Sequence, residues 1–158
     1  KEAVEKEIQY IQRKEGKVGK IVVNCFGNFE AFYNGEPIRF RRTLSKELFA
    51  LLIDRNGAGV TAKQICTWLW ESGTDDKKNM NYLYQLFDDL RTTLSAVNAE
   101  DVLQKNGYFY SIDTSKVICD YYEYLKVGKP QFYGEYMSQY SWAEETCAML
   151  ERKMISKD

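Results

Sequence analysis

The chain has 158 residues, of which 44% are hydrophobic, and its 22 basic and 23 acidic side chains give a net charge of -1. This length suffices for one sizeable core, or for one domain with an appendage. The balanced charge excludes binding to polyanions through bulk charge, so a nucleic-acid site must be a local patch. The absence of histidine excludes Ser-His-Asp catalysis, Cys-His catalysis and zinc sites that need imidazole.

The sequence also indicates in which cellular compartment the protein is expected. It has no run of about 18 apolar residues and no signal-peptide pattern at its start, so we expect neither a membrane span nor secretion. Because the first residue is Lys1 rather than Met, we expect a piece of a longer protein. The four widely spaced cysteines could pair as two disulfides, but buried free thiols in a cytoplasmic protein are the simpler interpretation. They lack the close ligand pairs that a four-cysteine metal site usually has.

The first third of the chain predicts a helix and then a small sheet. Residues 1–16 form a charged pattern with apolar side chains at helical spacing. Strands are predicted over 21–23 and 29–33, because these segments are rich in β-branched and aromatic residues. Asn34-Gly35 predicts a two-residue hairpin turn, after which 37–41 returns antiparallel. Together these segments give an N-terminal sheet of three or four short strands.

Three helices are predicted next. The first covers 45–55, with Gly57 just beyond its end. The second opens with a capping box formed by Thr61 and Gln64 and continues to about Trp70. After a polar loop over 71–76, the third helix covers 77–97. Its apolar side chains alternate steps of three and four and define one buried face: Met80, Leu83, Phe87, Leu90, Leu94 and Val97.

A second hairpin completes the central pattern. Residues 102–105 and 108–112 flank an Asn106-Gly107 turn signal. The order of sheet, three helices and hairpin predicts an α+β fold of the winged helix-turn-helix class, with an N-terminal antiparallel sheet and a C-terminal hairpin wing.

The tail from Cys119 predicts a short C-terminal helical segment. Asp120 is expected to cap its first helix, which Gly128 and Pro130 end. A second capping box, Ser141 to Glu144, is expected to open a helix that continues to about residue 155. The tyrosines of the tail are expected to pack into a core. The tail helices either dock on the winged helix or begin a further helical domain.

The order and spacing of several short motifs resemble a known family. These are Cys25-Phe26-Gly27-Asn28-Phe29-Glu30, Asn34-Gly35, Pro37-Ile38-Arg39-Phe40-Arg41-Arg42, Ser45-Lys46-Glu47-Leu48, Leu69-Trp70-Glu71, Leu90-Arg91 and Gly107-Tyr108. Together they resemble OmpR/PhoB-type winged-helix domains and, more narrowly, SARP-type regulators. Residues 134–144 resemble the start of the bacterial transcriptional activation domain of those regulators. The resemblance covers roughly residues 20–150.

This resemblance implies a domain division and a function. The division would be a linker helix over 1–16, a winged-helix DNA-binding domain over 17–118 and the start of an activation domain over 119–158. The function would be that of a bacterial, cytoplasmic transcription activator, often in a two-component system with a receiver domain upstream. Its partners would be double-stranded DNA and RNA polymerase, with no cofactor. Paired DNA half-sites would suit a homodimer.

The resemblance also implies which residues contact DNA, because in this family the third helix enters the major groove and the wing contacts phosphates. Opposite the buried face, the predicted helix presents polar side chains that include Asp88 and Asp89. Asn81 and Gln85 are one turn apart and suit adenine edges, whereas Arg91 suits guanine or phosphate. The candidate DNA-binding residues are Arg41, Arg42, Lys77, Lys78, Asn81, Tyr82, Gln85, Arg91, Thr92, Lys105 and Tyr108.

A competing hypothesis follows from the acidic side chains. Asp88 and Asp89 would repel phosphates, and residues 17–118 are barely net positive. A winged helix that binds another protein instead of DNA would fit these charges, and Asn81 and Gln85 also fit an ordinary solvated face. An enzyme is not expected, because no helper residues are grouped around a Cys, Ser, Lys or carboxylate nucleophile.

Overall fold

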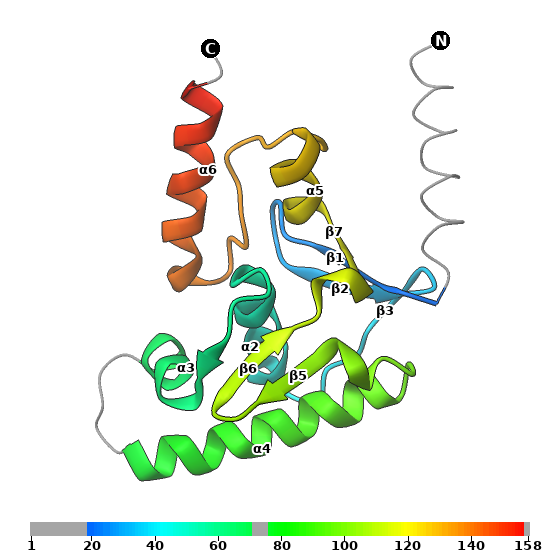
Figure 1. The fold of residues 1–158 in the computed structure, drawn as a ribbon, viewed down its shortest axis with the longest axis vertical. Coiled ribbons are helices and arrows are strands. Elements are labelled where there is room, and N and C mark those ends of the chain that lie inside the picture. The colour runs from blue at the N-terminus through cyan, green and yellow to red at the C-terminus, as the bar shows by residue number, and fades with distance from the viewer. Residues whose placement is uncertain (1–18, 71–75, 157–158) are drawn as a thin grey trace.

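The computed structural model describes residues 19–70 and 76–156. The predicted helix over 1–16 and nearly all of the predicted loop over 71–76 lie outside these residues. The described elements are, in chain order, β1 (Ile21–Asn24), β2 (Glu30–Tyr33), β3 (Glu36–Pro37), α2 (Thr43–Asp54), β4 (Val60–Thr61), α3 (Ala62–Leu69), α4 (Asp76–Ser95), β5 (Leu103–Asn106), β6 (Phe109–Ile112), β7 (Val117–Cys119), α5 (Asp120–Val127) and α6 (Glu144–Ser156). Their α+β arrangement agrees with the predicted fold class (Figure 1).

The N-terminal sheet has the strand order β3-β2-β1-β7. Asn34 and Gly35 both have positive φ angles, 50° and 83°, which confirms the type I′ turn between β2 and β3. The predicted return strand over 37–41 is wrong in length, because β3 ends at Pro37. Pro37 has no N–H group to continue the ladder, and the chain leaves the sheet toward α2. The fourth strand is β7, which pairs parallel to β1 from much later in the chain.

Helix α2 lies at the centre of the core, packed against α4 and the strand β6. Its Leu48, Phe49 and Ile53 side chains are fully buried. The capping box of α3 is confirmed: the Thr61 hydroxyl accepts the Gln64 N–H at 3.2 Å, and the Gln64 side-chain oxygen accepts the Thr61 N–H at 2.9 Å. These side chains satisfy backbone donors that have no partner inside the helix.

The hairpin β5–β6, called the wing below, pairs Asn106 with Phe109. Its two loop residues are therefore Gly107 and Tyr108, one position later than the predicted Asn106-Gly107 turn. Gly107 occupies the first central position with a φ of 63°, as a type II′ turn requires. The short strand β4 joins the wing on its other side and makes a three-stranded sheet.

Both capping predictions in the tail are wrong. The N-cap of α5 is Cys119, and the Asp120 carboxylate instead accepts backbone N–H groups of Cys25 at 2.7 Å, Phe26 at 3.0 Å and Tyr121 at 2.8 Å. Ser141 does not cap a helix, because it begins a 3-10 turn whose N-cap is Tyr140. The physical reason in the first case is the parallel pairing of β7 with β1, which brings the end of β1 to the start of α5.

The tail docks on the winged helix through hydrogen bonds to α2. The Tyr122 hydroxyl donates to the Ile53 carbonyl at 2.6 Å, the Tyr136 hydroxyl to the Asp54 carboxylate at 2.8 Å, and the Trp142 indole to Glu47 at 2.8 Å. Figure 1 shows α4 at one end of the molecule and α5 and α6 toward the other. The tail therefore covers the side of α2 that α4 leaves free, while the domain boundary at residue 118 stays a prediction.

Candidate nucleic-acid interface

Helix α4 has one fully buried face. Leu83, Phe87, Leu90 and Leu94 have no exposed surface, as the helical spacing predicts, and Leu86, which the sequence pattern left out, is equally buried. The predicted core positions Met80 and Val97 are half-buried, and Val97 lies beyond the end of the helix. The Phe87 ring stacks on Tyr110 of the wing at 4.0 Å between centroids. This packing fixes which side of α4 faces solvent.

The outer face of α4 is unbroken and exposed. It carries the predicted residues Asn81, Tyr82, Gln85, Asp88, Arg91 and Thr92. Tyr84 also lies on this face and is 46% exposed. Tyr84 was not among the predicted residues, although it is three residues after Asn81 and four before Asp88, the same spacing that identified the others. Because α5 and α6 lie away from this face, the tail does not cover it (Figure 1).

The prediction that Asp89 lies on the outer face is wrong. It is only 8% exposed. Its Oδ2 atom lies 3.1 Å from a terminal nitrogen of Arg42 and 3.5 Å from the Ser45 hydroxyl, in the first turn of α2. The N-terminal turn of a helix favours a negative charge, and the guanidinium neutralises this carboxylate. The physical reason is the 100° step per residue, which turns Asp89 from the outer face toward α2.

Asp88 is on the outer face as predicted, but it also has a basic partner. Its Oδ1 atom lies 3.3 Å from a terminal nitrogen of Arg91, and both side chains are exposed. An exposed pair of this kind is weak, so a stronger partner can separate it. The Arg91 guanidinium also lies 5.7 Å from the centroid of the Phe87 ring. Local compensation therefore reduces the negative potential that Asp88 and Asp89 create on α4.

The predicted basic residues occupy different environments. Lys77 and Lys78 are exposed in the first turn of α4, and Arg41 is exposed before α2. Arg42 is half-buried, paired with Asp89, and its guanidinium lies 5.8 Å from the Tyr82 ring. Arg42 therefore holds α2 and α4 together as well as bordering the outer face.

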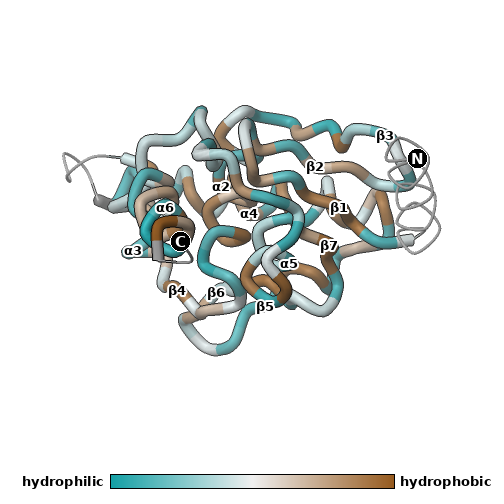
Figure 2. Tube along the Cα trace, turned by 90° about the horizontal axis from the view of Figure 1, so that it is seen from above, coloured by the Kyte–Doolittle hydropathy of each residue, from teal (hydrophilic) through white to brown (hydrophobic). Residues whose placement is uncertain are grey.

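The wing borders the opposite edge of the same face. Phe87, which contacts the wing, and Asp89, which contacts Arg42, lie on opposite sides of Asp88 around the helix. The wing tip projects from the body of the molecule (Figure 2). At the tip, Tyr108 is 85% exposed, and the exposed Lys105 has its Nζ atom 5.5 Å from the Tyr110 ring. The structure thus places Asn81, Tyr82, Gln85, Arg91 and Thr92 on one face of α4, with Arg42 and the wing at its borders.

Comparisons with known proteins give a likeness of fold. No family model matches the chain, and no curated protein matches it. Among solved structures it is similar to Mycobacterium tuberculosis EmbR in complex with a low-affinity phosphopeptide, with a TM-score of 0.67 and 15% sequence identity over 87% of this chain. The match covers 44% of the EmbR chain, so this chain spans less than half of that protein. The likeness supports a winged-helix-like fold.

Two further observations concern the described residues. Within them, no helix combines the length and the apolar character needed to cross a membrane. All four cysteines are free thiols; Cys25 and Cys119 are buried, and Cys66 and Cys147 are half-buried. The Sγ atoms of Cys25 and Cys119 lie 3.6 Å apart. The prediction of free thiols is confirmed, whereas the prediction of complete burial holds for Cys25 and Cys119.

Proposed function

We propose that this chain is the DNA-binding module of a transcription regulator and that α4 enters the major groove. The observation that carries the proposal is the exposed polar face of α4, an unbroken helix in which the adjacent Asp88 and Asp89 each have an arginine partner. The fold likeness to EmbR, a transcriptional regulator, supports a regulatory role.

The side chains on this face match the chemistry of base edges. Asn81 and Gln85 can each make the two hydrogen bonds that an adenine edge offers in the major groove. Arg91 can exchange its weak pair with Asp88 for guanine or phosphate. Lys77 and Lys78 stand at the start of α4, where the backbone N–H groups also favour a phosphate. Tyr108 and Lys105 would contact the sugar-phosphate backbone from the wing.

The cellular context and the partners form part of the same proposal. We propose a bacterial activator in the cytoplasm, controlled by a receiver domain and acting with RNA polymerase, that reads paired half-sites as a homodimer. No catalytic activity is proposed for the chain.

The test is selection of duplexes from a random library, followed by fluorescence anisotropy with the selected duplex at several salt concentrations. Gln85→Ala should weaken specific binding about tenfold, because a lost bidentate contact costs roughly 1–3 kcal/mol. Lys77→Ala should weaken binding to all sequences alike and lower the salt slope by about one. Glu123→Gln, at an exposed position of α5, is the control and should change neither value. Failure to retain any duplex at low salt would overturn the proposal.

The exposed aromatic residues favour one alternative, a winged helix that binds another protein. Tyr84, Tyr108 and Phe109 are 46%, 85% and 51% exposed on α4 and the wing, and aromatic residues are enriched in protein interfaces. Replacing Asp88 by Arg separates the two functions, whereas the buried Asp89 cannot be used for this purpose. If α4 binds DNA, Asp88→Arg raises the affinity for DNA. If α4 binds a protein, the variant loses that partner and still fails to bind DNA.

A further inference from the structure

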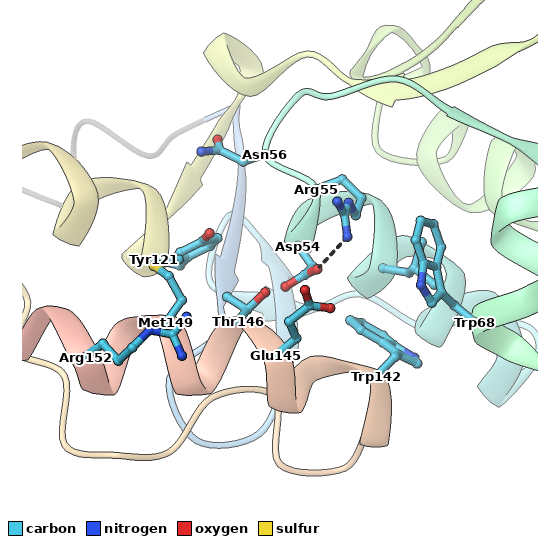
Figure 3. A pocket seen from close by; sticks show the side chains of 11 residues that line it. Asp54, Arg55, Asn56, Trp68, Tyr121, Trp142, Glu145, Thr146, Met149 and Arg152 are labelled. Atoms are coloured by element: carbon cyan, nitrogen blue, oxygen red, sulfur yellow. Dashed lines mark ion pairs between the residues drawn. The ribbon is translucent and has the colours of Figure 1, made fainter.

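A pocket of about 360 Å³ lies where the tail helix α6 meets the C-terminal end of α2 and the helices α3 and α5 (Figure 3). Its volume is within the range of about 300–1,000 Å³ that small-molecule sites occupy. Winged-helix and tail residues both line it, and such boundaries are frequent places for ligands. The pocket lies away from the outer face of α4, so its occupant is a question separate from DNA binding.

Arg55 provides a hydrogen-bond donor that no described residue satisfies. The Cζ atom of its guanidinium lies 4.9 Å from the Trp68 ring centroid, and its Nε atom is buried with no hydrogen-bond partner among the described residues. The Asp54 carboxylate is 4.0 Å from a terminal nitrogen of Arg55, which is too long for a hydrogen bond. The planar edge of a guanidinium suits a carboxylate, which can accept two parallel hydrogen bonds.

Two carboxylates lie close to this arginine. Asp54 is buried and accepts the Tyr136 hydroxyl through Oδ1. Burial raises the pKa of Asp54, hydrogen bonds from Thr146 and Tyr136 and the charge of Arg55 lower it in part, and the negative charge of Glu145 has a smaller raising effect. Figure 3 shows Glu145 extending from α6 toward Asp54 and Arg55. A positively charged group between Asp54 and Glu145 would relieve this repulsion.

Two indole rings complete the pocket. Trp68 comes from α3, and Trp142 precedes α6. Trp142 is fixed before any ligand arrives, because its indole N–H donates to Glu47 at 2.8 Å and its ring stacks on Tyr140 at 5.1 Å. A wall fixed in advance reduces the conformational entropy that the protein loses when a ligand binds.

We propose that this pocket binds a free amino acid. The charges that line it are balanced, with Asp54 and Glu145 against Arg55 and Arg152. The ligand carboxylate would bind the guanidinium of Arg55, whose side chain is 39% exposed, the ammonium would face Glu145, and the side chain would lie against the indole rings. A simple anion would meet the two carboxylates and a simple cation the two guanidiniums, so a zwitterion fits best.

The first experiment titrates the full chain with L-phenylalanine and follows tryptophan fluorescence, since phenylalanine is transparent where indole is excited and Trp68 and Trp142 line the pocket. Phenethylamine lacks the carboxylate and 3-phenylpropionate lacks the ammonium; each should bind at least about tenfold more weakly. Calorimetry extends the titration to the other amino acids. The proposal is wrong if no amino acid binds up to about 10 mM, or if either half-ligand binds as tightly as the zwitterion.

Substitutions test whether the amino acid binds in this pocket. Arg55→Gln and Glu145→Gln should each weaken amino-acid binding at least about tenfold, through loss of a charge-assisted hydrogen bond. Arg39→Gln, an exposed arginine outside the pocket, should leave the affinity unchanged. Because Glu145 is exposed, its variant is expected to fold even if Arg55→Gln does not, as circular dichroism will show. Unchanged affinity in Glu145→Gln would overturn the assignment.

Discussion

The Asp89 carboxylate is part of the packing between α2 and α4, although it follows an exposed aspartate in the sequence. Its side chain is 10% exposed, and it lies against Arg42 and Ser45. An adjacent acidic pair on a helix therefore contains two residues with different roles. Asp88 affects the surface potential of the outer face, whereas Asp89 affects stability.

Arg42→Met should destabilise the protein by about 1–3 kcal/mol, because it leaves the Asp89 carboxylate buried without its cation. The loss stays below that of a fully buried pair, since the Arg42 side chain is 38% exposed. Urea unfolding measures this difference. Arg41→Met is the matched control: Arg41 is exposed, and its replacement should change the free energy of unfolding by less than about 0.5 kcal/mol. Equal effects of the two substitutions would show that the Arg42–Asp89 pair contributes nothing.

Asp54 makes stability depend on pH in a predictable direction. Burial raises the pKa of Asp54 above its ordinary value of 3.8, so at pH values between 3.8 and the folded pKa the folded protein holds a proton that the unfolded chain releases. This contribution to stability is complete below that value and is lost as the pH rises through the folded pKa.

Asp54→Asn removes this titration while keeping an oxygen that can accept the Tyr136 hydroxyl. Compared with the wild type, the variant should therefore gain stability as the pH is raised from about 4 to about 7. Urea unfolding of both proteins across this range measures the difference. A difference that stays constant with pH would contradict the raised pKa.

At the scale of elements, short-range signals predicted the helices α2 to α6 and the strands β1, β2, β5 and β6, but they missed β4 and β7. The apolar spacing located α4 within two residues at its C-terminal end, and Thr61 with Gln64 located the start of α3, because these signals act within one or two helical turns. β4 and β7 have two and three residues, and each is stabilised by a partner strand distant in sequence. No periodicity can be measured over so few residues.

The capping box of α3 gives a prediction at the same scale. Thr61→Ala should cost about 1 kcal/mol of stability, because the Gln64 N–H loses its acceptor. Thr67→Ala, in the last turn of α3, is the control: its hydroxyl donates to the Lys63 carbonyl, a bond that adds little to a helix. Chemical denaturation should separate the two variants. If Thr61→Ala and Thr67→Ala destabilise the protein equally, the effect comes from lost packing and not from the lost cap.

For the whole molecule, the candidate interface was more predictable than the pocket. The α4 residues are close in sequence and follow one helical period. The residues of the pocket lie in or next to α2, α3, α5 and α6, and lining residues such as Asp54 and Glu145 are far apart in the sequence. Such contacts depend on how the tail docks. The many tyrosines of the tail predicted that these side chains are buried, but not which residues they contact.

The winged helix and the tail should unfold together. Tyr121, Tyr122, Phe132 and Leu150 of the tail are buried in the same core as α2 and β1, so neither part keeps a complete core alone. Tryptophan fluorescence and far-ultraviolet circular dichroism should give coincident urea transitions. An early transition confined to the tail would show instead that residues 119–158 form a separate unit.

The central claim is that the outer face of α4 enters a DNA duplex, and nuclear magnetic resonance tests it most directly. The isotope-labelled chain is titrated with the duplex that selection recovers. If the outer face binds DNA, changes in amide chemical shift will concentrate on Lys77, Asn81, Tyr84, Gln85 and Thr92 of α4 and on the wing tip, while α6 is unaffected. Shifts that concentrate on α5 and α6, or a spectrum that no duplex changes at low salt, would contradict it.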